Sequence, residues 1–534
     1  MDGVAITVFI FFFLLVTILG FIAASWRRGN LNELHEWGLA GRRFGTVVTW
    51  FLLGGDLYTA YTFIAVPGAM FGVGALSGFF AVPYTVLIYP LIFILMPKFW
   101  TICKQRNYVT AADFVRDRFG SRSLALAVAF TGILATMPYI ALQMYGIQIS
   151  IAALGIPVTV PILGFNVDLP LLVAFVILAA YTYTSGLRAP AMIALVKDLM
   201  IFVVLFATLI YIPFKIGGFG PIFAAAQAKA VAAPKTFNDI LSGPQISAYT
   251  TLALGSALAL FLYPHSLTGV LSSSNTKVVK RNTALLPIYS LMLGLLALLG
   301  YMAIQAQVKP KAPFGNNWAV PGLILHFFPS WFWGFAFAAI AIGALVPAAV
   351  MSIAAANLFT RNIYTAYLRK NATDHEETRV ARITSLILKF GALLFIVYLP
   401  AQNVINFQLL GGVWILQTLL PVFLGLYTHW FNRWALLVGW LAGMVVGTLM
   451  EFSGIISGTS AALVNVYPIS LGGSTMLIFT GFAALILNIV VAIVFTPIFE
   501  LVGARRGVDL TQASDYDEEH APVEVTEHGQ EALS

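Results

Sequence analysis

The sequence predicts an all-α protein that crosses a lipid bilayer many times, and two observations support this fold class. Of the 534 residues, 60% are hydrophobic and 10% are charged, and the mean hydropathy is +0.89. A soluble domain carries roughly 25% charged residues. Apolar runs of about 18 residues or more, the length that spans the hydrocarbon core, recur along the whole chain. We therefore expect a polytopic membrane protein with about 13 transmembrane helices.

Charged residues, glycines and prolines separate the apolar runs and set the expected helices. These helices span residues 4–25, 46–72, 79–97, 122–153, 169–186, 190–213, 249–273, 284–306, 332–366, 382–399, 404–427, 435–453 and 476–498. The first run is not expected to be a secretory signal, because Asp2 precedes it while Arg27 and Arg28 follow it, which is the reverse of signal polarity. Together the helices form one expected transmembrane domain, residues 1–502.

The last residues, 503–534, differ from the rest of the chain. They hold eight acidic side chains and no apolar run. A segment of this composition cannot bury enough apolar surface to fold by itself. We expect a disordered cytoplasmic tail.

Basic residues orient the helices. With the N-terminus outside, 22 of the 29 Lys and Arg residues fall in inside loops, five fall in outside loops, and Lys197 and Lys389 lie within helices. Cytoplasmic loops of membrane proteins are enriched in Lys and Arg. The sequence thus predicts an external N-terminus and a cytoplasmic C-terminus, and the net charge of +7 does not indicate nucleic-acid binding. The single cysteine, Cys103, excludes an intrachain disulfide and a cysteine metal cluster.

Two of the expected helices are interrupted. The helix over 46–72 carries Gly54-Gly55-Asp56, and the helix over 249–273 carries Tyr263-Pro264-His265. Each begins a block of five helices. Interruptions at corresponding positions of two halves indicate an inverted-repeat transporter whose site lies at the breaks.

Three ionisable residues lie within expected helices near these breaks. They are Asp56 in the second helix and the adjacent pair Lys197 and Asp198 in the sixth. Charged groups at membrane depth are costly, so such residues indicate an ion pathway, although a structural ion pair or snorkelling to the interface would also place them there. Adjacent helix positions are about 100° apart, so we expect only one of the pair to face the break.

The helix over 332–366 carries a stripe of small residues. Ala349, Ser352 and Ala356 share one face. Such a stripe allows close helix packing. The Ser352 hydroxyl could instead supply a neutral oxygen to a monovalent cation.

Polar residues near the breaks are candidate solute contacts. A half-helix beginning near Thr59 to Thr62 would offer free N–H groups to a carboxylate. Tyr139 and Gln143 are spaced i, i+4 and can face one cavity. An interhelical hydrogen bond is the alternative role for each residue.

Further polar residues occur at the second break and in the eleventh helix. Tyr263 flanks the second break, and Gln417 lies in the middle of the eleventh helix. Both are candidate substrate contacts, again with interhelical hydrogen bonding as the alternative. We interpret His265 as a buried core histidine.

Several stretches together resemble the sodium:solute symporter family. They are GLAGRRFGTVVTWF (38–51), the second helix, YTYTSGLRAPAMIALVKD (181–198), IGGFGPIFAAA (216–226) and AAVMSIAAANLFTRNIY (348–364). The resemblance covers about residues 1–500 and implies a thirteen-helix fold with a five-plus-five inverted-repeat, LeuT-like core. The runs GGDLYTAYTFIAVPGAMFG and PYIALQMYG also resemble bacterial monocarboxylate permeases, which implies a bacterial inner membrane location.

The resemblance further implies a Na+ site. Its ligands would be the carbonyl oxygens of Gly55, Tyr58 and Ala349 and the hydroxyl of Ser352. Asp198 would line the ion path. This sequence departs from the family pattern at Ile353, where relatives keep a second hydroxyl.

The coupling ion stays open at the level of the sequence. Lys197 beside the family aspartate can replace a cation electrostatically. Sodium-driven symport is the first expectation, and proton coupling through Asp56, Lys197 or Asp198 is the alternative.

The expected function is cation-coupled import of a small monocarboxylate such as lactate or pyruvate. Another small solute, such as an amino acid or acetate, is the alternative substrate, and a membrane sensor or a channel is the alternative class. No enzyme is expected, because no nucleophile is paired with a base and no phosphate loop occurs. The expected partners are the organic acid, a monovalent cation and the bilayer, with no cofactor other than the coupling ion, no nucleic acid and no obligate protein partner.

Overall fold

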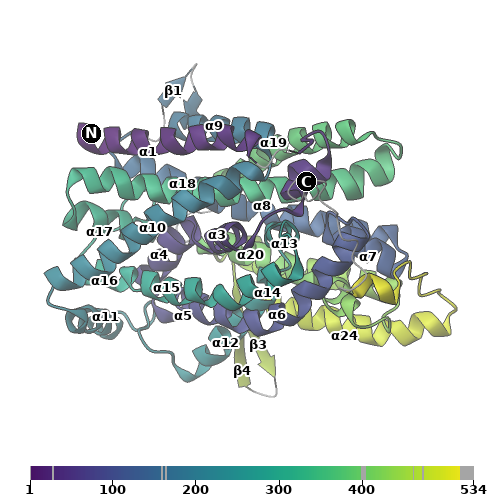
Figure 1. Ribbon diagram of the computed structural model, residues 1–534. Helices are drawn as coiled ribbons and strands as arrows, with labels where there is room; N and C mark the ends of the chain where they lie inside the picture. The colour runs from purple at the N-terminus through teal and green to yellow at the C-terminus, as the bar shows by residue number, and fades with distance from the viewer. Residues whose placement is uncertain are drawn as a thin grey trace.

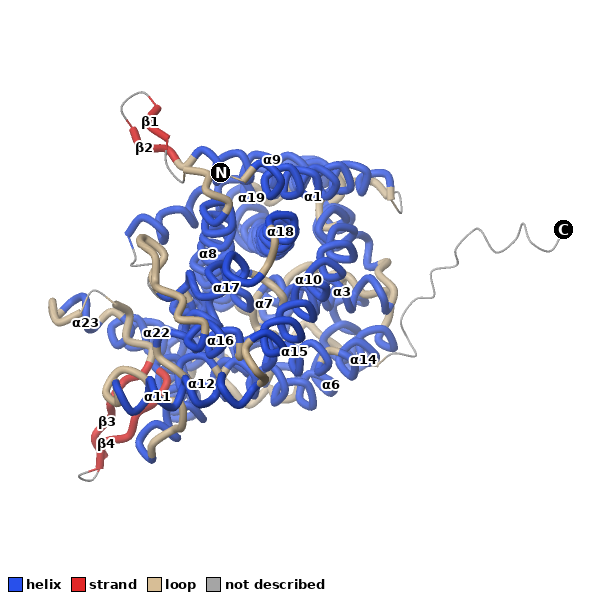
Figure 2. Tube along the Cα trace, turned by 90° about the vertical axis from the view of Figure 1, so that its left-hand side faces the viewer, coloured by secondary structure: helices blue, strands red, loops and turns tan. Residues whose placement is uncertain are grey.

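The computed structural model describes residues 2–26, 29–157, 160–162, 165–398, 404–460, 462–471 and 474–517. Within them the long helices lie side by side (Figure 1). The described strands form two antiparallel hairpins at opposite edges of the helix bundle. One pairs β1 (Val160–Ile162) with β2 (Phe165–Val167), and the other pairs β3 (Val466–Leu471) with β4 (Ser474–Phe479) (Figure 2).

The helices of the first half follow the predicted order. They are α1 (Gly3–Ile22), α2 (Leu34–Leu39), α3 (Thr46–Leu57), the π-helix η3 (Tyr61–Ala65), α4 (Val66–Gly72), α5 (Ala75–Gly78), α6 (Ala81–Gln105), α7 (Ala111–Phe119), α8 (Arg122–Ala153), α9 (Leu169–Ser185), α10 (Arg188–Lys215) and α11 (Phe219–Ala232).

The second half contains α12 (Gly243–Leu260), α13 (Pro264–Leu271), α14 (Thr276–Leu285), α15 (Pro287–Ala297), α16 (Leu299–Gln305), α17 (Ala319–Phe327), α18 (Ser330–Phe359), the π-helix η5 (Thr360–Leu368), α19 (Asp374–Tyr398), α20 (Ile405–Ile415), η7 (Leu416–Thr418), α21 (Leu419–Val422), η8 (Leu424–Leu426), α22 (Arg433–Glu451), α23 (Ser453–Ile456), α24 (Thr480–Leu501) and η9 (Ala513–Tyr516).

The number of membrane spans is close to the predicted one. In the described residues, ten helical segments are long and apolar enough to cross a bilayer. The pair α12 and α13, bent by 46° at its break, raises the number to eleven. The thirteen expected spans also include α9, whose apolar helix is shorter, and α19, whose predicted range ends at 399, outside the described residues. The all-α polytopic class is confirmed, and the number thirteen stays a prediction.

Helix α18 forms the centre of one half of the bundle (Figure 2). It packs against α1, α8, α10 and α19, and its apolar window is entirely buried. Small residues allow this approach, since a Cβ added at Gly334 would lie 2.2 Å from the Ala5 carbonyl oxygen. The predicted stripe of Ala349, Ser352 and Ala356 is buried as well. The sequence of α18 therefore suits close helix packing on every side.

The chain after α24 folds back over the ends of α6 and α7. Arg106 forms an ion pair with Asp515, with 2.6 Å between Nη2 and Oδ2, and Arg118 pairs with Asp509 at 2.8 Å. Residues 503–517 thus make defined contacts, in contrast to the disorder expected for them. Local composition could not show this, because the partner arginines lie about 390 to 410 positions away. The rest of the expected tail, 518–534, lies outside the described residues.

Truncation tests this terminal segment. Ending the chain after Val502 removes both carboxylates and leaves Arg118, which is only 10% exposed, without its ion-pair partner. Since a hydrogen bond to a charged group contributes about 1.5–3 kcal/mol, we expect the melting midpoint in detergent to fall by about 2 °C or more. Ending the chain after Asp517 is the matched control and should leave the midpoint unchanged. Equal midpoints for both truncations would contradict a stabilising role for residues 503–517.

Candidate functional site

The first interrupted helix breaks later than its glycines predict. Helix α3 continues through Gly54, Gly55 and Asp56 to Leu57, and the helix is interrupted at Tyr58, where φ is −92° and ψ is 86°. A π-helix and α4 then complete the span. The interruption therefore lies about one turn after the glycine pair, and the second half begins near Thr59 to Thr62, as expected.

The two glycines allow neighbouring side chains to approach α3. A Cβ at Gly54 would lie 2.2 Å from the Tyr289 ring, and a Cβ at Gly55 would lie 2.8 Å from Lys197 Nζ and 2.9 Å from Asp198 Oδ2. At distances below 3.0 Å a side chain could be added only if these neighbouring groups moved. The absence of side chains at these positions, rather than backbone freedom, is what the site requires.

The ammonium group of Lys197 binds the carbonyl oxygens at the break. Its Nζ donates to Gly55 O at 2.5 Å and to Tyr58 O at 3.1 Å, and it lies 3.1 Å from Asp198 Oδ1. Lys197 and Asp198 are both fully buried. Carbonyl groups freed inside a membrane need a donor or a cation, and here a covalently attached cation satisfies them.

Asp198 and Tyr289 complete this cluster. Tyr289 donates its hydroxyl to Asp198 Oδ2 at 3.0 Å, and its own carbonyl accepts from the Tyr58 hydroxyl at 2.9 Å. Both Lys197 and Asp198 therefore reach the α3 break, which corrects the expectation that only one would. The lysine side chain is long enough to fold back across the helix surface, and the 100° argument does not take this length into account.

The two candidate cation ligands of α18, the Ala349 carbonyl oxygen and the Ser352 hydroxyl, are hydrogen-bonded to each other. The Ser352 hydroxyl donates to the Ala349 carbonyl at 2.9 Å within the helix. Ile353, one position on, packs with Leu52 of α3 in a small apolar cluster. Of the four expected cation ligands, Gly55 and Tyr58 are thus bound to Lys197, and Ala349 and Ser352 are paired within α18.

The second interrupted helix breaks where the sequence predicts. Helix α12 ends at Leu260, and α13 begins at Pro264. The first turn of α13 meets the end of α3, where His265 Nε2 lies 3.3 Å from Asp56 Oδ2, and Ser266 Oγ donates to the same oxygen at 3.4 Å. Asp56 and His265 therefore join the two broken helices.

The amide groups that follow the α3 break are satisfied by nearby side chains. Gln143 of α8 accepts from Ala60 N at 3.2 Å and donates to Thr59 Oγ1 at 3.3 Å. Thr59 Oγ1 accepts from Tyr61 N at 3.0 Å, and Thr62 Oγ1 accepts from Thr59 N at 3.2 Å. The structure brings the predicted contacts Thr59, Thr62 and Gln143 together, with the half-helix N-terminus capped.

Comparison with known proteins assigns this arrangement to a family. Residues 37–447 match the sodium:solute symporter family. The chain belongs to this family. It is 52% identical over 494 residues to the monocarboxylate transport permease protein of Rhizobium johnstonii, over 92% of this chain and 96% of that protein. It is 31% identical to the uncharacterized symporter YodF of Bacillus subtilis, over 91% of this chain and 92% of that protein.

A solved structure shows the same fold. The substrate-bound, outward-open structure of a Na+-coupled sialic acid symporter superposes with a TM-score of 0.70 at 16% identity, over 93% of this chain and 98% of that chain. The predicted LeuT-like class is confirmed. The protein is a multi-pass membrane transporter that couples a cation to a small solute, and it is not an enzyme.

The remaining predicted contacts lie in different places in the symporter. The Tyr139 and Tyr263 rings meet at 5.6 Å and each contacts the His265 ring, at 5.5 and 5.2 Å. Gln417 instead donates to Val413 O and accepts from Asn488 of α24 at 3.2 Å. Gln417 thus makes the interhelical contact that was its alternative role, and the two tyrosines line the Asp56–His265 pair.

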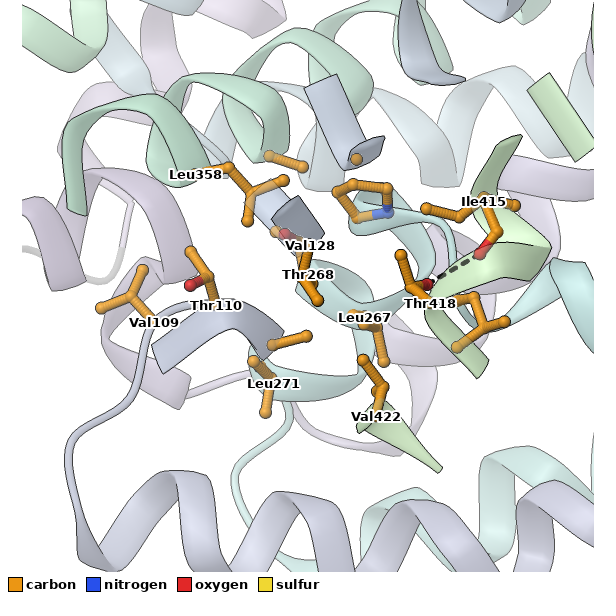
Figure 3. A pocket seen from close by; sticks show the side chains of 15 residues that line it. Val109, Thr110, Val128, Leu267, Thr268, Leu271, Leu358, Ile415, Thr418 and Val422 are labelled. Atoms are coloured by element: carbon orange, nitrogen blue, oxygen red, sulfur yellow. Dashed lines mark hydrogen bonds between the residues drawn. The ribbon is translucent and has the colours of Figure 1, made fainter. Parts of the chain in front are cut away.

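A cavity lies beside the second break of the symporter, on the side of α7 (Figure 3). It reaches Leu262 and Pro264 at the break. Three threonines interrupt its otherwise mostly apolar lining, and Thr418 donates to the Ile415 carbonyl at 2.7 Å. The cavity is lined both by residues at the break and by Ala111 at the start of α7. The labelled lining residues are Val109, Thr110, Val128, Leu267, Thr268, Leu271, Leu358, Ile415, Thr418 and Val422.

Sequence reasoning missed two residues of this site, His265 and Tyr289. His265 was interpreted as a core histidine, although it contacts Asp56. Asp56 and His265 lie at the interruptions of the second and the seventh expected helix, which occupy corresponding places in the two halves. This shared position was a usable signal. Tyr289 lies on α15 within an unbroken apolar run, and its role depends on the absence of a side chain at Gly54.

Replacement of Gln143 tests the closure of the α3 break. Gln143→Leu leaves the Ala60 amide and the Thr59 hydroxyl without this partner, and an unsatisfied buried polar group costs about 1–3 kcal/mol. We expect a lower melting midpoint in detergent. Gln143→Glu keeps an acceptor for Ala60 and should lose less, and Met144→Leu controls for disturbance of α8. A midpoint unchanged by Gln143→Leu would show that the cap contributes nothing to stability.

Proposed function

We propose that the symporter imports a small monocarboxylate, such as lactate or pyruvate, together with a proton. The substrate class is supported by the 52% identical relative, whose name is monocarboxylate transport permease protein. Aromatic rings of Tyr139 and Tyr263 beside the breaks suit a short carbon chain. The Asp56–His265 pair next to them supplies polar atoms for a carboxylate.

The position of Lys197 carries the proposal for the coupling ion. Its ammonium binds the Gly55 and Tyr58 carbonyls, which the family resemblance assigns to Na+. A lysine side chain stays in the protein, whereas a bound Na+ enters from the solution and leaves to it. With this position filled and Ile353 in place of a second hydroxyl, a proton is the coupling ion that the site accommodates. Sodium-driven import is the competing outcome of the test below.

The orientation and location of the protein belong to the same proposal. An external N-terminus and a cytoplasmic C-terminus agree with 22 Lys and Arg residues on one side against five on the other. The cavity on the α7 side would then face the cytoplasm. The bacterial inner membrane is the proposed location.

Uptake into proteoliposomes tests the proposal directly. With sodium, proton and voltage gradients set independently, an inward proton gradient should drive accumulation of labelled lactate or pyruvate above its equilibrium level. A sodium gradient at equal pH should not. Accumulation driven by sodium alone would refute proton coupling, and no accumulation under either gradient would refute symport of these acids. Trans-stimulated exchange separates a carrier from a channel, which would show none.

Removal of the resident ammonium tests its role in the site. Lys197→Ala leaves Asp198 and the two carbonyls uncompensated, and breaking a buried ion pair costs about 3–5 kcal/mol. We expect proton-driven uptake to fall by at least about tenfold. Sodium should raise the melting midpoint of this variant and leave that of the wild type unchanged, since Na+ can then enter the vacated position.

Lys215→Ala, at the exposed end of the same helix, is the matched control for this variant and should behave as wild type. An identical sodium response in the wild type and in Lys197→Ala would contradict the assignment of Lys197 as the resident cation.

A further inference from the structure

Asp56 and His265 form a buried pair at the meeting point of the two broken helices, and each keeps one polar atom without a partner. Asp56 Oδ2 and His265 Nε2 are 3.3 Å apart. Asp56 Oδ1 and His265 Nδ1 are buried and have no hydrogen-bond partner. We infer that His265 binds the substrate carboxylate through Nδ1 and carries the coupled proton at that atom. The inference rests on the proposed function and deepens it.

Two unpartnered buried atoms on one contact pair indicate a missing ligand. Buried polar atoms in folded proteins are almost always hydrogen-bonded, and leaving one unpaired costs free energy. His265 is 2% exposed and Asp56 is 9% exposed. A small acid bound at this pair would supply a partner for the imidazole.

The contact with Asp56 determines which histidine nitrogen changes its protonation. A carboxylate oxygen is an acceptor and lies 3.3 Å from Nε2, so we assign the hydrogen of the neutral imidazole to Nε2. Nδ1 is then the nitrogen that is free to gain a proton. With that proton in place, the Nδ1–H donates to the substrate carboxylate, and no covalent bond other than N–H forms or breaks. The proton comes from the external solution and leaves to the cytoplasm with the acid.

The balance of charge gives one proton for each acid. Lys197 and Asp198 compensate each other at 3.1 Å, which leaves Asp56 as the net charge of the site. A monocarboxylate beside an ionised Asp56 would place two anions together at low dielectric, which is costly. An imidazolium between them offsets this repulsion. The site then has the same total charge when it is empty and when it holds both proton and acid.

Other titratable groups near His265 do not supply this charge. Tyr139 and Tyr263 contact its ring, and Tyr84 of α6 lies near Tyr139 and Tyr263. The Lys197 ammonium is held by Asp198 and by the carbonyls of Gly55 and Tyr58. Helix α18, which also packs on α13, contains no charged or histidine residue in its sequence.

Helix α2, which carries His35 and Glu36, is the remaining neighbour of α13. The residues just after α2 contact the end of α13 that lies away from His265. Arg42, just after α2, donates to Leu271 O at 3.1 Å at that end, and Glu36 is bound to Arg188. Glu36 is therefore paired away from His265.

A neutral replacement of the imidazole provides the decisive transport test. His265→Gln keeps an amide that can hydrogen-bond a carboxylate but cannot take up a proton. In proteoliposomes we expect this variant to lose proton-driven accumulation of lactate by at least about tenfold while trans-stimulated lactate exchange persists. His326→Gln, an exposed histidine on α17, is the matched control and should accumulate lactate as the wild type does. Full proton-driven accumulation by His265→Gln would overturn the inference.

The two proposals fail in distinguishable ways. If the wild type shows no proton-driven uptake, the proposed function is refuted whatever the variant does. If the wild type is proton-driven and His265→Gln is equally so, only the role of His265 is refuted.

A measurement on the wild type covers the case in which the variant does not fold. When lactate is added to the purified protein in weakly buffered solution, we expect the protein to take up about one proton per acid bound, as the charge balance requires. Histidine-selective isotope labelling should show one of the seven imidazoles changing to the protonated form on lactate addition. Assignment of that signal to another histidine, or proton uptake without any imidazole change, would overturn the inference.

Discussion

The bond between the Lys197 ammonium and the backbone at the α3 break is the interaction on which the centre of the symporter depends. An interrupted helix in a membrane exposes carbonyl oxygens that lipid cannot satisfy. Lys197 satisfies those of Gly55 and Tyr58, and Asp198 offsets its charge. Tyr289 then links Asp198 to Tyr58. Helices α3, α10 and α15 are thereby joined through one polar cluster that is closed to water.

The backbone groups at the two ends of the break are hydrogen-bonded by different kinds of side chain. On the carbonyl side a charge is used, whereas on the amide side Gln143 accepts from Ala60. A neutral amide can be displaced by an arriving ligand at a smaller cost than a buried charge can. The carbonyl side is therefore the more firmly held part of the break, and the amide side is held by the weaker bonds of Gln143 to Ala60 and Thr59.

The sequence predicts the helices and the two interruptions well, because both follow from local composition. Apolar length sets the spans, and Tyr263-Pro264-His265 marks the second break at its observed place. The first break is displaced, because Gly54 and Gly55 serve the approach of Tyr289 and Lys197, which is a property of two other helices. The pairing of Asp56 with His265 and the contact of Asp509 with Arg118 likewise join distant segments. Local patterns do not show that Asp509 meets Arg118, so the contacts of the terminal segment could not be predicted. For Asp56 and His265, the matching positions at the two interruptions were a signal, whereas the contact itself depends on how the two helices pack.

A resident cation changes how transport can be driven. A dissolved ion shifts a conformational equilibrium only through its different affinity for the two states, and it supplies energy because it arrives from one side and leaves to the other. The Lys197 ammonium does neither, since it stays attached to α10 in every state. It can hold α3 and α10 together through the Gly55 and Tyr58 carbonyls. The driving ion must therefore act on a group that exchanges with both solutions. Among the polar groups at the two breaks, the Asp56–His265 pair has unpartnered atoms on both members and adjoins a residue, Pro264, that lines the cavity on the α7 side.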